Sequence, residues 1–139
     1  MAKIIFSTQE VSFTLEFDDQ ITTNFKWCTC YVQHNNHVHK MGAEALHIIV
    51  DRFLKALSKT EQEIKETIKE LNPGHKFGVC AFNEGYGSVS IDYTAGNVVL
   101  NFWDGGMNLI CQTKLSGFEK EKWVKSFQEL KGISSPSLK

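Results

Sequence analysis

The sequence lacks an uninterrupted hydrophobic segment long enough to cross a membrane as a helix, which requires about 20 apolar residues. The most apolar segment, residues 45–57, is interrupted by four polar side chains: His47, Asp51, Arg52 and Lys55. The first residues also lack the apolar core and the cleavage site of a secretory signal. We therefore expect no membrane association and a cytoplasmic location.

A charge excess of either sign is also missing. Fifteen lysine and arginine residues face 16 aspartate and glutamate residues, which gives a formal net charge of −1. A chain with this balance has no global field that would attract a phosphate backbone or an anionic lipid surface. Nucleic acid is therefore not the expected partner.

No compositional bias marks a disordered or repetitive chain. Hydrophobic residues make up 42% of the sequence and charged residues 22%, which is ordinary for a folded globular protein. A domain of 139 residues buries roughly two thirds of the surface that its unfolded chain exposes. We predict one α+β domain over residues 1–133 and a flexible tail over residues 134–139.

Catalytic motifs are absent as well: the chain contains no G-x-S-x-G, no P-loop and no H-E-x-x-H. His47 and Asp51 lie one helical turn apart, which suits either a general base with its orienting acid or an ion pair on a helix surface. We favour the surface pair because no nucleophile lies near it in the sequence. The chain is predicted to bind without catalysis and without a cofactor.

One segment concentrates the residue types that bind metals: Cys28, Cys30, His34, His37 and His39. Zinc takes cysteine sulfur and histidine nitrogen in sets of four, so this segment supplies suitable chemistry. The spacing matches no established zinc motif, however, and Asn35-Asn36 predicts an exposed turn. We interpret the segment as a polar loop and keep these five residues as alternative metal ligands.

Periodicity predicts where the strands and helices lie. Alternating or apolar runs predict N-terminal strands at residues 4–6, 11–17 and 25–32. Apolar residues at helical spacing predict three helices, which end near Leu57, Leu71 and Gly132. The second helix should begin at a capping box, either Ser58 with Glu61 or Thr60 with Glu63, and the third at the capping box of Ser116 with Glu119. The last helix should bury Trp123, Val124, Phe127 and Leu130.

Residues 76–115 predict an antiparallel β-meander of four strands, separated by turns at residues 84–86, 95–96 and 104–105. Two-residue loops at the second and third turns and a three-residue loop at the first give nine apolar pairs on one face. These pairs are Phe77–Tyr93, Val79–Ile91, Ala81–Val89, Tyr93–Val98, Ile91–Leu100, Val89–Phe102, Phe102–Met107, Leu100–Leu109 and Val98–Cys111. The fold class is therefore α+β: this meander packs against two or three helices, and the N-terminal strands extend its sheet or form a second one.

The opposite face of the meander follows from the same register. It combines short polar side chains with two aromatic rings: Phe82, Ser88, Ser90, Asp92, Asn101, Trp103 and Asn108. Rings beside hydrogen-bonding groups suit a docking surface, because rings supply contact area at a small loss of conformational entropy. The same pattern also fits a solvated outer face on which the two rings cover one another.

Three hypotheses about function follow. The favoured one is a small non-catalytic binding or inhibitor protein that neutralises a partner protein through the polar face of the meander, as an immunity protein or a phage anti-defence protein does. The second is a protein that binds a small ligand or nucleotide, with a base stacked on Phe82 or Trp103 and a homo-oligomer closing the pocket. The third is a metal-dependent enzyme that uses residues 28–39.

Overall fold

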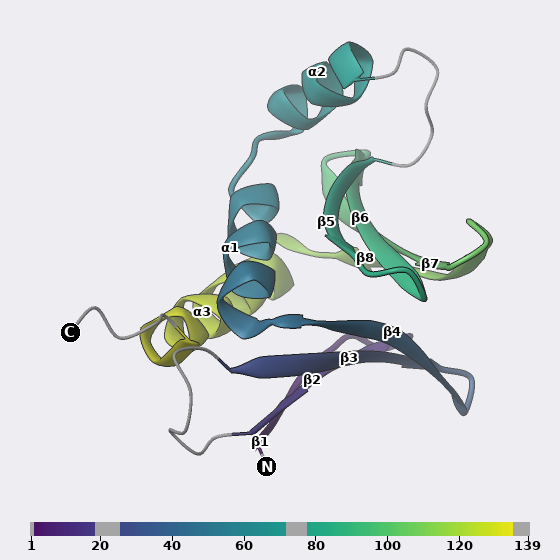
Figure 1. Ribbon diagram of the computed structural model, residues 1–139. Helices are drawn as coiled ribbons and strands as arrows, with labels where there is room; N and C mark the ends of the chain where they lie inside the picture. Colours follow the sequence, from purple (N-terminus) through teal and green to yellow (C-terminus); the bar gives the residue numbers. More distant parts are fainter. Residues whose placement is uncertain (1, 19–25, 72–77, 135–139) are drawn as a thin grey trace.

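The computed structural model describes residues 2–18, 26–71 and 78–134. It has an α+β fold with two antiparallel sheets, each of four strands in sequence order (Figure 1). The N-terminal sheet contains β1 (Ala2–Ser7), β2 (Ser12–Phe17), β3 (Trp27–His34) and β4 (His37–Ala45). The C-terminal sheet contains β5 (Val79–Asn83), β6 (Gly87–Thr94), β7 (Asn97–Asp104) and β8 (Leu109–Leu115). The helices are α1 (Leu46–Leu57), α2 (Glu61–Leu71) and α3 (Gly117–Ser134). The predicted fold class is confirmed, and the N-terminal strands form a second sheet.

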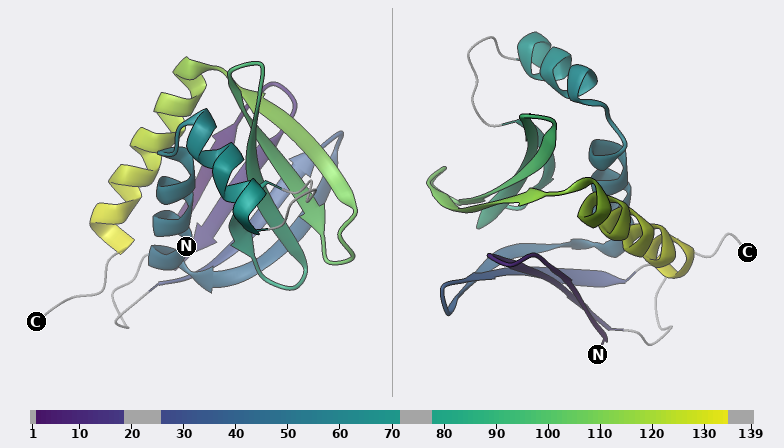
Figure 2. Two further views of the ribbon diagram at one scale, coloured as in Figure 1. Left: turned by 90° about the horizontal axis from the view of Figure 1, so that it is seen from above. Right: turned by 180° about the vertical axis from the view of Figure 1, so that it is seen from behind.

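The two sheets face each other and enclose the hydrophobic core, with α1 and α3 side by side at one end (Figures 1 and 2). A series of buried aromatic rings connects the sheets and helices. The ring centroid of Phe102 in β7 lies 5.7 Å from that of Phe13 in β2, which lies 5.4 Å from that of Phe53 in α1. Phe127 of α3 extends the series, because its ring stacks on Phe53 with a centroid distance of 4.8 Å. Each buried ring of this kind stabilises the fold by about 1.5–3 kcal/mol through the area that it removes from water.

The order of elements occurs twice: four strands and then one helix, with α2 between the two sets. α2 covers one end of the C-terminal sheet, where Ile64 is fully buried. Tyr93 of β6 fixes this end, because its hydroxyl donates to the carbonyl of Lys59 at 3.1 Å and accepts from Lys120 of α3 at 3.0 Å. None of the helices in the described part of the chain is long and apolar enough to span a membrane.

The histidine-rich segment is part of a β-hairpin and not a loop. Asn35 and Asn36 form its two-residue turn with φ of 47° and 65°, and His34 pairs with His37 across it. Asparagine tolerates this left-handed conformation, and two such residues in a row are typical of the tightest hairpin turns. The interpretation as a loop was therefore wrong, although the turn itself was predicted.

The predicted register of the meander is confirmed between β6 and β7, in all three pairs. It is also confirmed for Val79 and Ile91 between β5 and β6. Beyond that pair a bulge at Ala81 shifts the register by one residue, so that Phe82 and not Ala81 faces Val89. A bulge reverses the side of the sheet to which the following side chains point. Phe82 is accordingly 1% exposed in the core.

The predicted register between β7 and β8 was wrong. Asp104 and Asn108 close a three-residue loop in which Met107 has φ of 66°, whereas a two-residue loop at Asp104-Gly105 was predicted. A bulge at Ile110 adds one further residue. Phe102 therefore pairs with Cys111, and Leu109 pairs with Trp103 on the other face of the sheet.

The helix ends follow the predictions in part. Thr60 and Glu63 form the capping box of α2, and Ser116 and Glu119 form that of α3, each with two reciprocal hydrogen bonds of 3.1 Å. The alternative box at Ser58 does not form, because Ser58 ends α1 and donates to the carbonyl of Lys55.

α3 has the predicted core face but a different end. Trp123, Phe127 and Leu130 are buried and Val124 is partly buried against the core. The helix passes through Gly132, the predicted stop, to Ser134. Residues 135–139 of the predicted tail, residues 72–74 at the predicted end of α2, and Phe77 lie outside the described residues.

Candidate functional site

The outer face of the β5–β8 sheet, which points away from β1–β4, carries most of the predicted binding residues. Strand pairing brings five of them together: Ser88, Ser90, Asp92, Asn101 and Trp103. Asn108 lies in the β7–β8 loop, at the Trp103 end of the face. Phe82 lies in the core, so the prediction that it belongs to this face was wrong.

The outer face is concave, because the sheet curls away from β1–β4 at both ends (Figures 1 and 2). On a concave face, neighbouring small side chains reduce one another's exposure to solvent. Ser90 is 5% exposed and Asn101 6%, although both point away from the main core. Val99, which is 3% exposed, lies on the same face and outside the main core cluster. We call the residues Ser90, Asp92, Val99 and Asn101 the floor of this face. Three of them, Ser90, Val99 and Asn101, are shielded from water before any partner binds.

Hydrogen bonds fix the side chains of the floor. The indole nitrogen of Trp103 donates to the hydroxyl of Ser90 at 2.9 Å. The amide of Gln112 donates to Asn101 at 2.5 Å, and the carboxylate of Asp92 accepts from the backbone of Tyr93 at 2.7 Å. Side chains held in this way lose little conformational entropy when a partner docks, which favours affinity.

Four large side chains lie at the Trp103 end of this face and in the adjoining turns, and we call them the apolar end: Tyr86, Trp103, Met107 and Leu109. Tyr86 is 72% exposed, Met107 50% and Leu109 48%. Leu109 is opposite Trp103 in the strand pairing, and Gly87 next to Tyr86 pairs with Asp104 next to Trp103. Tyrosine, tryptophan and methionine are the residue types that protein interfaces accumulate.

Two turns that lie against each other carry the apolar end. A β-carbon at Gly105 would lie 2.5 Å from the carbonyl oxygen of Gly85 and 3.6 Å from the α-carbon of Tyr86, so the two turns are in contact. The carboxylate of Asp104 accepts from the backbone of Gly106 and of Asn108, both at 2.9 Å. These bonds lower the pKa of Asp104 and hold the β7–β8 loop in one conformation.

Three of these residues were not predicted to belong to this face. Met107 and Leu109 were assigned to the core face, and the loop and the bulge described above bring them to the surface instead. Tyr86 was considered only as part of a turn. A signal was present, because an aromatic side chain between Gly85 and Gly87 in a tight turn has no strand neighbour to cover it.

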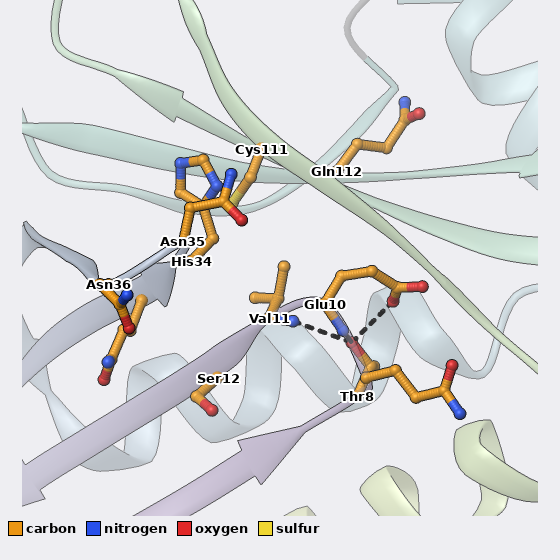
Figure 3. Close-up of a pocket in the computed structure, with 11 residues that line it drawn as sticks. Thr8, Glu10, Val11, Ser12, His34, Asn35, Asn36, Cys111 and Gln112 are labelled. Carbon is orange, nitrogen blue, oxygen red and sulfur yellow. Dashed lines mark hydrogen bonds between the residues drawn. The ribbon is translucent and has the colours of Figure 1, made fainter.

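A hollow of about 600 Å³ lies between the sheets at the edge formed by β8 (Figure 3). The β1–β2 turn, the β3–β4 turn and residues Cys111 and Gln112 line it. The hydroxyl of Thr113, which is 3% exposed, donates to Glu10 at 2.9 Å and lies 2.8 Å from the hydroxyl of Thr8. The hydrogen bonds that Thr113 and then Thr8 donate to the Glu10 carboxylate lower the pKa of Glu10. The carboxylate thus joins the two sheets, which is a structural role.

The five alternative metal ligands are not assembled into one site. Cys28 and Cys30 are buried on the inner face of β3, where their contact and burial raise the pKa of Cys30. His34 and His39 stack at 6.1 Å near the opposite end of the β3–β4 hairpin, and His37 is exposed beside its turn. Among the described residues no group of three or more histidine, cysteine, aspartate or glutamate side chains could hold a metal ion.

A pair of carboxyl groups joins the two sheets at another point. Glu44 of β4 and Glu84 of the β5–β6 turn share a hydrogen bond, which raises the pKa of Glu84. The pKa of Glu44 is lowered, first by the backbone N–H of Ala45, which donates at 2.8 Å, and then by Glu84. Asp51, the predicted companion of His47, lies 3.9 Å from Lys131 of α3, in an exposed ion pair.

Comparisons with models of protein families, with curated proteins and with solved structures found no match to this chain.

Proposed function

We propose that this chain is a small non-catalytic inhibitor that binds a partner protein through the outer face of the β5–β8 sheet. The immunity protein and the phage anti-defence protein are the two types that fit the proposal, and the proposed site of action is the cytoplasm. The observation that carries it is the apolar end: Tyr86, Met107 and Leu109 are exposed together beside Trp103 and a polar floor.

The arrangement supports a protein partner in two ways. An exposed apolar cluster with polar neighbours resembles the centre and rim of a protein interface, whereas single exposed apolar residues need no explanation. The floor adds hydrogen-bonding groups that are already fixed, such as the Ser90 hydroxyl and the Asn101 amide. The rings would supply affinity and the floor would supply orientation.

A photo-crosslinking experiment tests the proposal in cells that carry the gene. Tyr86 is replaced by a photoreactive phenylalanine derivative, and the matched control places the same group at Phe118, which is 75% exposed at the start of α3. We expect one protein to be crosslinked at position 86 and not at position 118. Expression of that protein alone should impair growth, and co-expression of this chain should restore it.

Purified proteins then give the energetic test. Central aromatic residues of an interface contribute about 2 kcal/mol or more, so Tyr86→Ala and Trp103→Ala should each weaken binding by about 30-fold or more. Phe118→Ala should leave the dissociation constant unchanged. If Tyr86→Ala and Leu109→Ala both bind the partner as tightly as the natural chain does, the binding surface has been misplaced.

A further inference from the structure

A second hollow, of about 610 Å³, lies on a different side of the molecule, between α1, α2 and the edge strand β5. Three basic side chains line it, namely Arg52 and Lys55 of α1 and Lys59 just after that helix. Thr67 of α2 and Cys80 and Asn83 of β5 line the other sides. Its volume is within the range of small-ligand sites, about 300–1,000 Å³.

The three basic residues line one cavity because of their spacing. Arg52 and Lys55 are three residues apart on α1, which places them on the same side of the helix, and Lys59 follows two residues after the last helical residue. Ala56 and Val79 give the hollow an apolar wall. A charge next to such a wall is screened less by water than a charge on an open surface.

The described carboxylates near the three cations lie outside the lining of the hollow. Among the described residues that line the hollow there is no aspartate or glutamate, and no ion pair within 4.0 Å links the three cations to a described carboxylate. Arg52 acts electrostatically on Glu44 and Glu84, and Lys59 acts on Glu63, but none of these three carboxylates lines the hollow. Asp51, one helical turn before Lys55 on α1, does not line it either.

The donors present also indicate the ligand. Arg52 offers a planar fork, the two lysines offer point charges, and the exposed amide of Asn83 adds a neutral donor. Three cations around one cavity suit an oxyanion with more than one negative charge, and phosphate accepts bonds from all of these donors. We propose that this hollow binds a small phosphate-bearing anion. The site shares no residue with the apolar end, so a negative result for the anion site would not contradict the proposed function, and the reverse also holds.

Cys80 provides a direct readout, because its thiol is exposed in the hollow. Alkylation by N-ethylmaleimide, followed by mass spectrometry, is measured with and without inorganic pyrophosphate at constant ionic strength. We expect pyrophosphate to slow the alkylation of Cys80. Cys111 is an internal control, because it lies in the other hollow, and the buried Cys28 and Cys30 report whether the protein stays folded.

Substitutions identify the residues that hold the anion. Loss of one charge-assisted hydrogen bond weakens binding by about tenfold, so Arg52→Gln and Lys55→Gln should each raise the half-protecting concentration about tenfold. Lys55→Arg keeps the charge and should keep protection. Lys125→Gln, on the exposed side of α3, is the matched control and should behave as the natural chain.

A second ligand separates the two sources of phosphate. Equal protection by pyrophosphate and ADP would show that the phosphates alone are recognised, and stronger protection by ADP would show that the nucleoside adds contacts. The proposal is overturned if neither compound protects Cys80 more than sodium chloride of the same ionic strength. It is also overturned if Arg52→Gln and Lys55→Gln are both protected as well as the natural chain.

Discussion

The two sheets have the same strand order and are each followed by one helix, yet their outer faces differ. On β2 of the N-terminal sheet, buried and half-buried residues alternate along the whole strand. The large exposed side chains of this sheet, Ile5, Trp27 and Val38, belong to three different rows of paired residues. On β7 of the C-terminal sheet, five consecutive residues are buried, and the large exposed side chains gather at one end.

The difference has two parts. Small side chains on the concave side of β6 and β7 are buried, and no helix of the described residues lies over them (Figure 1). Two bulges then exchange side chains between the faces of the C-terminal sheet: Phe82 enters the core and Leu109 leaves it. The N-terminal sheet also has a bulge, at Met41, but Met41 is fully buried, whereas the bulges of the C-terminal sheet leave Leu109 exposed at one end. This difference supports the proposal that the C-terminal sheet binds the partner.

The largest expected effect tests the exchange itself. Phe82→Ala should lower the free energy of unfolding by about 3–5 kcal/mol, because it removes a ring from the core. Leu109→Ala is the matched change on the other side of the exchange and should cost less than about 1 kcal/mol, because the side chain is half exposed. Urea unfolding measures both. The opposite order would mean that the strands pair without bulges.

A smaller effect is expected where the two sheets meet. Gly42 has φ of +130°, and a β-carbon there would lie 2.7 Å from the carbonyl oxygen of Glu84 in the opposite sheet. Gly42→Ala should therefore lower the free energy of unfolding by about 2–4 kcal/mol, through backbone strain and separation of the sheets. Gly132→Ala, in the open interior of α3, should raise it by up to about 1 kcal/mol. Equal changes in the free energy of unfolding for Gly42→Ala and Gly132→Ala would contradict the close contact between Gly42 and Glu84.

The smallest effect depends on pH and concerns the Glu44–Glu84 pair. The pKa of Glu84 is raised above its usual 4.5, so its contribution to stability is complete below that pH and is lost as the pH rises through the folded pKa. The pKa of Glu44 is lowered, so its contribution is present above 4.5 and is lost as the pH falls through its folded pKa.

Glu84→Gln keeps a hydrogen-bond donor for Glu44 and removes the ionisation of Glu84. We expect this variant to be more stable than the natural chain at pH 7, by a few tenths of a kcal/mol because the pair lies near the surface. At pH 4 the advantage should vanish. Thermal unfolding at both pH values measures it, with Glu121→Gln on the exposed side of α3 as the control. An equal gain at pH 4 and pH 7 would show that repulsion between the carboxylates is not its source.

The parts that sequence reasoning predicted correctly depend on neighbours in the chain. The β6–β7 hairpin formed in the predicted register because Ala95-Gly96 is a two-residue turn, with φ of 52° and 81°. The capping box at Thr60 formed because its donor and acceptor are three residues apart. The β3–β4 hairpin was missed because strand β4, with His37, Lys40 and Glu44 among its nine residues, has no apolar alternation to reveal it.

The candidate site was predicted in part for the same reason. The polar floor follows from the β6–β7 register, and Trp103, Ser90 and Asn101 lie where the alternation places them. Tyr86, Met107 and Leu109 could not be placed beside them, because their positions depend on contact between two turns and on the bulge at Ile110.

By itself the sequence determined the local structure of this protein: the helices with their apolar stripes, two capping boxes and one hairpin register. Tertiary structure decided which side chains the C-terminal sheet hides and which it displays. A single-residue bulge changes little in the local preference of a strand, but it moves each following side chain to the other face. The burial of Phe82 in the core and the contact between the two turns favour the bulged register, and neither is encoded within one segment of the chain.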